Sequence, residues 1–122
     1  MPASRAVALG LVAVAASLSA PVAVAADGAS VYSDHCLTCH QAGGEGVPSL
    51  QPSLLDSAIL AGDPDGLIAF MLSGDGASGE WGNVMPTYDF LTDEELAAVL
   101  TYARESFAGA DEISPEDVAA AR

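Results

Sequence analysis

The chain has 122 residues, 51% of them hydrophobic, and it carries 17 acidic residues against three basic ones, which gives a net charge of −14. This length fits one small domain. The sequence contains no lysine, so its charge excludes nucleic acid and anionic lipid headgroups as partners, because both require clustered cations. The same charge favours a soluble monomer, and it fits either a salt-rich habitat or docking to a basic partner.

Residues 1–26 have the pattern of a secretory signal peptide. Arg5 supplies a short positive region, an uncharged run covers residues 6–26, and small residues precede Asp27. An uncleaved membrane anchor is the alternative, because about 20 apolar residues can cross a bilayer as a helix. Pro21 and the weakly hydrophobic, alanine-rich composition favour cleavage. We therefore expect an exported, periplasmic protein without stable membrane insertion, whose net charge falls from −14 to −15 when Arg5 is removed.

The first half of the remaining chain predicts two helices separated by a loop. The first helix is expected over residues 27–39, beginning near Asp27 or Ser30. Residues 40–53 contain three glycines and two prolines, which permit neither a helix nor a regular strand. A short helix is expected over residues 54–61.

A clearer helical signal begins at Asp63, which is a good N-cap, with Pro64 at the first helical position. Gly74 is expected to end this helix, and a second glycine-rich loop follows over residues 73–90. The apolar residues of the helix recur at helical spacing: Leu67, Ile68, Met71 and Leu72.

The strongest helical signal opens at Thr92, where Thr92 and Glu95 form a capping box and three acids occupy the positive end of the helix dipole. One face of this helix is apolar: Leu96, Val99, Leu100 and Ala103. No segment alternates with a period of two, so the fold class is all-α. The expected division is a signal peptide over residues 1–26, a helical domain over residues 27–107 and an acidic C-terminal tail over residues 108–122.

Both predicted loops are longer than most loops of compact domains, which rarely exceed about 12 to 15 residues without a functional reason. They contain apolar residues and the single tryptophan rather than a flexible polar composition. A domain this small also has a modest core of its own. A large apolar prosthetic group, around which the loops wrap, would explain both features.

Cys36 and Cys39 are the only cysteines, and they precede His40 in a C-x-x-C-H motif. Two thiols at this spacing on a helical turn can each form a thioether to one vinyl group of haem, with the imidazole directed at the iron. A thioredoxin-like dithiol would need a preceding strand, which the pattern lacks. A zinc site would need four ligands, and its only candidates, which include His35, lie within six residues. A disulfide across two residues would leave His40 without a role.

The motif and its surroundings resemble a small monohaem class I cytochrome c of exported bacterial type. Gly28, Tyr32 and Cys36 follow at intervals of four, as in the first helix of that family, and Val99 with Tyr102 matches the helix that crosses it. The resemblance implies three to five short helices with long loops around one covalent haem c and its iron. It also implies that Gly28 allows the two helices to approach closely.

The same resemblance implies that Met85 is the second axial ligand of the iron, because the family's methionine lies in a loop just before the last helix. Met71 is the first alternative, although its place on an apolar helix face suits a core residue. His35 is the second alternative, but it is adjacent to Cys36 and therefore lies on the same face of the haem as His40. The second axial ligand must approach from the opposite face. A neutral thioether favours ferrous iron, so His/Met ligation would raise the reduction potential.

Supporting residues are also implied by the resemblance. A proline carbonyl in the loop after the motif accepts the second N–H of the histidine ligand, and Pro52 matches that position better than its alternative, Pro48. Trp81 resembles the tryptophan that donates to a haem propionate in many members, and it could equally cover the haem edge as a core residue.

The resemblance implies a single-electron carrier and not an enzyme, which passes electrons from a periplasmic dehydrogenase or respiratory complex to an acceptor such as a terminal oxidase. A subunit of a dehydrogenase complex is compatible with this function. The alternative is a haem sensor or small haem enzyme with an open sixth position. The chain departs from mitochondrial members in lacking their ring of lysines. Docking to redox partners would rest on acidic side chains, or on an apolar rim near Val47, Val84 and Pro86.

Overall fold

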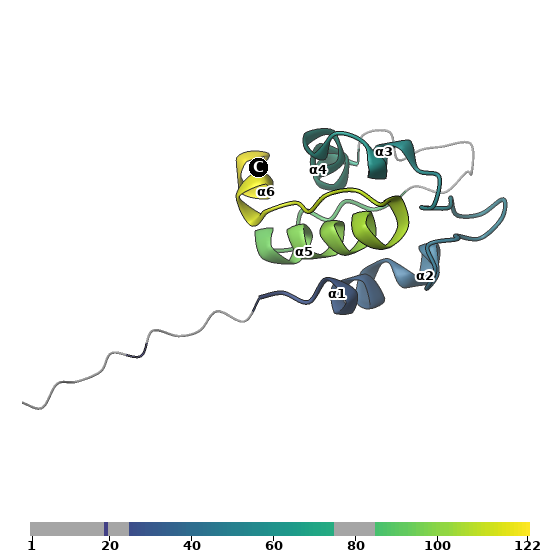
Figure 1. Cartoon of the computed structure of the whole chain (residues 1–122), viewed down its shortest axis with the longest axis horizontal. Coiled ribbons are helices and arrows are strands. Elements are labelled where there is room, and N and C mark those ends of the chain that lie inside the picture. Colours follow the sequence, from purple (N-terminus) through teal and green to yellow (C-terminus); the bar gives the residue numbers. More distant parts are fainter. Residues whose placement is uncertain (1–18, 20–24, 75–84) are drawn as a thin grey trace, which may run out of the picture.

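The structure is a computed structural model that describes residue 19, residues 25–74 and residues 85–122 (Figure 1). These ranges contain helices and no β-strand, apart from one isolated bridge between Val47 and Gln51. The predicted all-α class is therefore confirmed. The elements are α1 (Gly28–His35), α2 (Leu37–His40), α3 (Ala58–Ala61), α4 (Pro64–Ser73), α5 (Asp93–Ala103), the π-helical turn η1 (Arg104–Ala108) and α6 (Pro115–Ala120).

Helices α1 and α5 lie side by side (Figure 1). A Cβ atom on Gly28 would lie 2.8 Å from the carbonyl carbon of Ala98 and 2.9 Å from the Cβ of Tyr102, and closer still to the oxygen of Ala98. The rings of Tyr32 and Tyr102 pack beyond this contact, with centroids 5.3 Å apart. The expected close approach at Gly28 is thus confirmed.

The N-termini of α4 and α5 form as their local sequences predict. Asp63 accepts a hydrogen bond from Gly66 N at 3.2 Å, and Gly74 ends α4 in the left-handed region at φ 73°. Thr92 Oγ1 accepts from Glu95 N at 3.1 Å, while Glu95 Oε2 accepts from Thr92 N at 3.0 Å. These bonds satisfy amide groups that have no partner inside the helix.

Two predicted helices differ from the structure. The helix expected over residues 27–39 is interrupted at Cys36, whose φ of −117° departs from helical geometry, so α1 ends there and α2 begins. The helix expected over residues 54–61 begins only at Ala58, because Ser57 is its N-cap and accepts from Leu60 N at 3.3 Å. The backbone angle of Cys36 sets the first boundary and the capping bond of Ser57 sets the second, and the apolar pattern shows neither.

The core lies on the predicted apolar face of α5 and on the facing side of α4. Leu96 is fully buried, and the other predicted positions on α5 are also buried: Val99, Leu100 and Ala103. On α4 the buried residues are Leu67, Ile68 and Met71. Leu72 is only half-buried.

The segment after η1 returns along α5 and ends in α6 (Figure 1). Ser114 caps α6 with a capping box to Asp117, and Pro115 takes the first helical position. Ile113 and Val118 are buried against the core, with exposed fractions of 4% and 0%. Residues 109–122, although acidic, therefore contribute apolar side chains to the packing of α5.

Candidate functional site

Cys36, Cys39 and His40 lie on one helical turn at the junction of α1 and α2. The backbone N–H groups of Cys39 and His40 donate to the carbonyl of Cys36 at 3.2 and 2.9 Å. No disulfide joins Cys36 to Cys39. Burial, with a smaller contribution from Cys39, raises the pKa of Cys36 to about 11. Because a reactive dithiol requires a lowered pKa, the environment of Cys36 does not favour the thioredoxin-like alternative.

The imidazole of His40 is buried and held in one orientation. Its Nδ1 lies 3.2 Å from the carbonyl oxygen of Pro52 and donates to it when it carries the proton. Burial lowers the pKa of His40, and the Pro52 carbonyl partly opposes this effect. The neutral imidazole then keeps Nε2 as the nitrogen with a free lone pair. Of the two candidate loop prolines, Pro52 is the one whose carbonyl lies at this ring.

An apolar cavity brings His40 and Met85 together, although 45 positions separate them in the sequence. Both line the cavity, and so does Cys36. The remaining walls come from the loop before α3 and from α3, α4 and α5; their apolar residues include Leu54, Leu60, Leu67, Phe70, Val99 and Leu100. The donors at this cavity are one imidazole, from His40, and two thioethers, from Met85 and Met71. Imidazole and thioether are both ligands of haem iron. An apolar cavity with two thiols on its wall therefore fits covalent haem.

The alternative iron ligands occupy different places. Met71 is buried and lines the same cavity as Met85. His35 is exposed on α1, where its ring packs against Tyr88 and Phe90 at centroid distances of 6.4 and 5.5 Å. It is not among the residues that line the cavity.

Tyr88 fixes the chain that leaves the cavity after Met85. Its backbone N–H donates to Met71 O at 2.9 Å, and its hydroxyl donates to His35 O at 3.1 Å. Burial, ahead of electrostatic interaction with the two cysteines, raises the pKa of Tyr88 to about 12. The hydroxyl is therefore a neutral donor at physiological pH, and it ties this segment to α1.

Two predicted residues, Trp81 and Val84, lie outside the described residues. Within the described ranges no three His, Cys, Asp or Glu side chains gather in a group that could hold a metal ion. Arg104 and Arg122, which sequence reasoning left without a role, both bind backbone carbonyls of distant segments. No periodicity or motif identifies such contacts. The only available signal was their rarity, because they are the sole strong bases after residue 26.

Taken together, the helical fold and the apolar cavity define a small haem protein of the electron-transfer class. The model of the cytochrome c family matches residues 25–106. Cytochrome c-552 of Thermus thermophilus is 34% identical over 97 residues, which cover 72% of this chain and 73% of the relative. The cytochrome c subunit of gluconate 2-dehydrogenase from Pantoea cypripedii is 33% identical over 104 residues, which cover 78% of this chain but 24% of that subunit.

The chain belongs to the cytochrome c family. It is a small monohaem class I member, and the haem c of that family is covalently bound and contains iron. It takes part in haem-based electron transfer and is not itself an enzyme. No helix in residues 25–74 or 85–122 is both long enough and apolar enough to cross a membrane.

Proposed function

We propose that this protein is a soluble single-electron carrier whose haem is attached through Cys36 and Cys39 and ligated by His40 and Met85. The observation that supports this most strongly is that His40 and Met85 line one apolar cavity, with Cys36 in its wall. The donor would be a periplasmic dehydrogenase or respiratory complex, and the acceptor a protein such as a terminal oxidase. Similarity to a dehydrogenase cytochrome subunit supports a dehydrogenase as one partner.

When bound, the haem iron supplies reversible exchange of one electron between its ferrous and ferric forms. His40 donates through Nδ1 to Pro52, which keeps Nε2 available as a ligand and fixes the plane of the ring. Met85 supplies a neutral thioether, which favours the ferrous form and raises the reduction potential. Trp81 is proposed to donate its indole N–H to a haem propionate.

The competing function is a haem sensor or small haem enzyme with an open sixth position. If Met85 fills that position, the reduced protein should not bind carbon monoxide at neutral pH. The absorption spectrum of the reduced protein, recorded before and after equilibration with carbon monoxide, checks this directly. An immediate and stoichiometric spectral change would overturn the carrier function.

We further propose that residues 1–26 are a cleaved signal peptide and that the mature protein is a periplasmic monomer. Residues 27–107 would form the cytochrome c domain, followed by the acidic segment 108–122. The uncharged run before Asp27 and the pattern of small residues at its end support this division.

The charge of the described surface suggests a partner with a basic docking face. The side chain of Arg104 is buried and donates to Leu60 O, Gly62 O and Asp111 O. Arg122 forms an ion pair with Asp93. Both guanidinium groups are thus engaged within the molecule. The exposed acids Asp34 and Asp89 are the sequence neighbours of His35 and Phe90, whose rings pack against each other. Phe90 is 64% exposed.

We therefore expect electron transfer with a basic redox partner to slow steeply as salt is added, because screening weakens long-range attraction. Between 10 mM and 200 mM salt the second-order rate constant should fall about tenfold. The double substitution Asp34→Asn and Asp89→Asn should lower the rate at low salt and flatten this dependence. The substitution Asp65→Asn, at an exposed site in the first turn of α4, is the single-charge control. A rate that is unchanged or rises with salt would favour apolar docking instead.

A further inference from the structure

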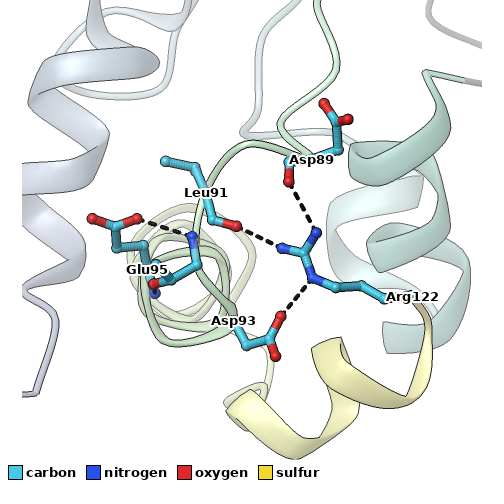
Figure 2. A network of polar contacts seen from close by, with 6 residues as sticks. Asp89, Leu91, Asp93, Glu95 and Arg122 are labelled. Atoms are coloured by element: carbon cyan, nitrogen blue, oxygen red, sulfur yellow. Dashed lines mark hydrogen bonds and ion pairs between the residues drawn. The ribbon is translucent and has the colours of Figure 1, made fainter.

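Arg122 forms two contacts with the segment that connects Met85 to α5 and a third with Asp93, the first residue of α5. Its Nη1 donates to Asp89 O at 2.9 Å, its Nη2 donates to Leu91 O at 2.5 Å, and its Nε donates to the Asp93 carboxylate at 2.5 Å. Figure 2 shows the guanidinium reaching from the end of α6 to these three acceptors. All three nitrogens of the side chain thus bind acceptors within the short stretch of residues 89–93.

The contacts of Arg122 add to other interactions that hold residues 88–92 in place. Tyr88 is tied to α4 and α1, Leu91 is buried with an exposed fraction of 5%, and Thr92 is held by its capping box to Glu95. Asp89 is exposed between these fixed points, and its carbonyl is held by Arg122 (Figure 2). The residues that follow Met85 are therefore anchored on both sides by elements distant in sequence.

Bonds from a guanidinium to carbonyl and carboxylate oxygens are stronger than neutral hydrogen bonds. The side chains of Arg122 and Asp93 are 33% and 31% exposed, so solvent weakens the ion pair but leaves it partly shielded. The two carbonyl contacts do not depend on a partner's charge. Their loss would leave the backbone between Tyr88 and Thr92 freer to move.

We propose that Arg122 is a positioning residue: it holds the segment after Met85 in place and thereby retains the Met85 thioether at the iron. This inference rests on the proposed role of Met85 as a ligand. The C-terminal helix α6 gains a function through this contact, since it carries Arg122 across α5 to the segment.

The test uses the ferric protein and imidazole, a small ligand that binds iron only when the methionine has left. In Arg122→Ala the rate constant for imidazole binding should rise at least about fivefold over wild type, because one or more charge-assisted bonds are lost. Arg122→Lys keeps the positive charge but loses the planar guanidinium. Its rate constant for imidazole binding should lie between those of wild type and Arg122→Ala. Ala69→Glu is the control, because it shifts net charge by the same amount at an exposed site on α4 and should leave the rate unchanged.

Amide hydrogen exchange gives a second readout that does not depend on iron ligation. Exchange at residues 88–92 should accelerate by a similar factor in Arg122→Ala, while amides in the middle of α1 keep their wild-type rates. Unchanged exchange at residues 88–92, or equal acceleration in α1, would overturn the inference. If wild type already binds imidazole as fast as Met85→Ala, the proposed ligand role of Met85 fails, whatever the exchange result.

Discussion

Replacing Met85 by alanine is expected to lower the reduction potential and to make the reduced protein bind carbon monoxide. The substitution removes the thioether that favours ferrous iron and opens the sixth position. Axial ligands set haem potentials over a range of roughly 0.8 V, and we expect a fall on the order of 0.1 to 0.3 V. A spectroelectrochemical titration measures the potential, and absorption spectra under carbon monoxide measure the open site.

Met71 offers a matched control, because it is buried in the wall of the same cavity. Met71→Leu conserves volume and removes the sulfur, so it should cost less than about 1.5 kcal/mol of stability and leave the potential near the wild-type value. If Met71→Leu lowers the potential and Met85→Ala does not, the two methionines have been assigned in the wrong order.

Gly28→Ala is expected to destabilise the protein by about 3 kcal/mol, the upper part of the range for overpacking. The added Cβ would meet the backbone of Ala98, and backbone cannot rotate away as a flexible side chain can. Separating α1 from α5 would also loosen the Tyr32–Tyr102 contact, which lies on the helix that leads to Cys36. Urea denaturation followed by circular dichroism gives the free energy of unfolding.

Gly66→Ala is the control for this substitution. In α4 the nearest atom to a Cβ at Gly66 is Asp63 Oδ2, at an ordinary contact distance of 3.7 Å. The control should therefore stabilise the protein by about 0.4 to 1 kcal/mol through reduced entropy of the unfolded chain. Equal effects at Gly28 and Gly66 would show that α1 and α5 do not need the close approach seen in the structure.

The parts of the fold that local sequence determines were predicted correctly. Asp63 and Thr92 start helices through bonds to amides three residues away, so the sequence signal and the structure that it predicts lie in the same few residues. Gly28 was also predicted, because a glycine at this place in a C-x-x-C-H helix is a family feature. The interruption between α1 and α2 at Cys36 was not predicted, because it depends on one backbone angle and leaves no mark on the composition of the sequence.

The candidate site combines residues that are adjacent in the sequence with residues that only folding brings together. Cys36, Cys39 and His40 form a motif, whereas the meeting of His40 with Met85 depends on how α4 and α5 enclose the cavity. The sequence left Pro48 and Pro52 as alternatives. The structure places the Pro52 carbonyl at the imidazole, which depends on the path of a whole loop.

The two arginines illustrate what sequence reasoning could not reach. Arg104 binds Leu60 O, 44 positions away, and Arg122 binds Leu91 O, 31 positions away. Carbonyl acceptors carry no side-chain signature, because every residue has one. Such contacts are visible only once the chain has folded.

The most direct test of His40/Met85 ligation is the proton magnetic resonance spectrum of the reduced wild-type protein. A methionine bound to haem iron lies over the ring, whose current shifts the methyl signal far upfield. We predict one such signal, present in wild type and Met71→Leu and absent in Met85→Ala. A spectrum without an upfield methionine signal, or a signal that persists in Met85→Ala, would contradict the proposed site.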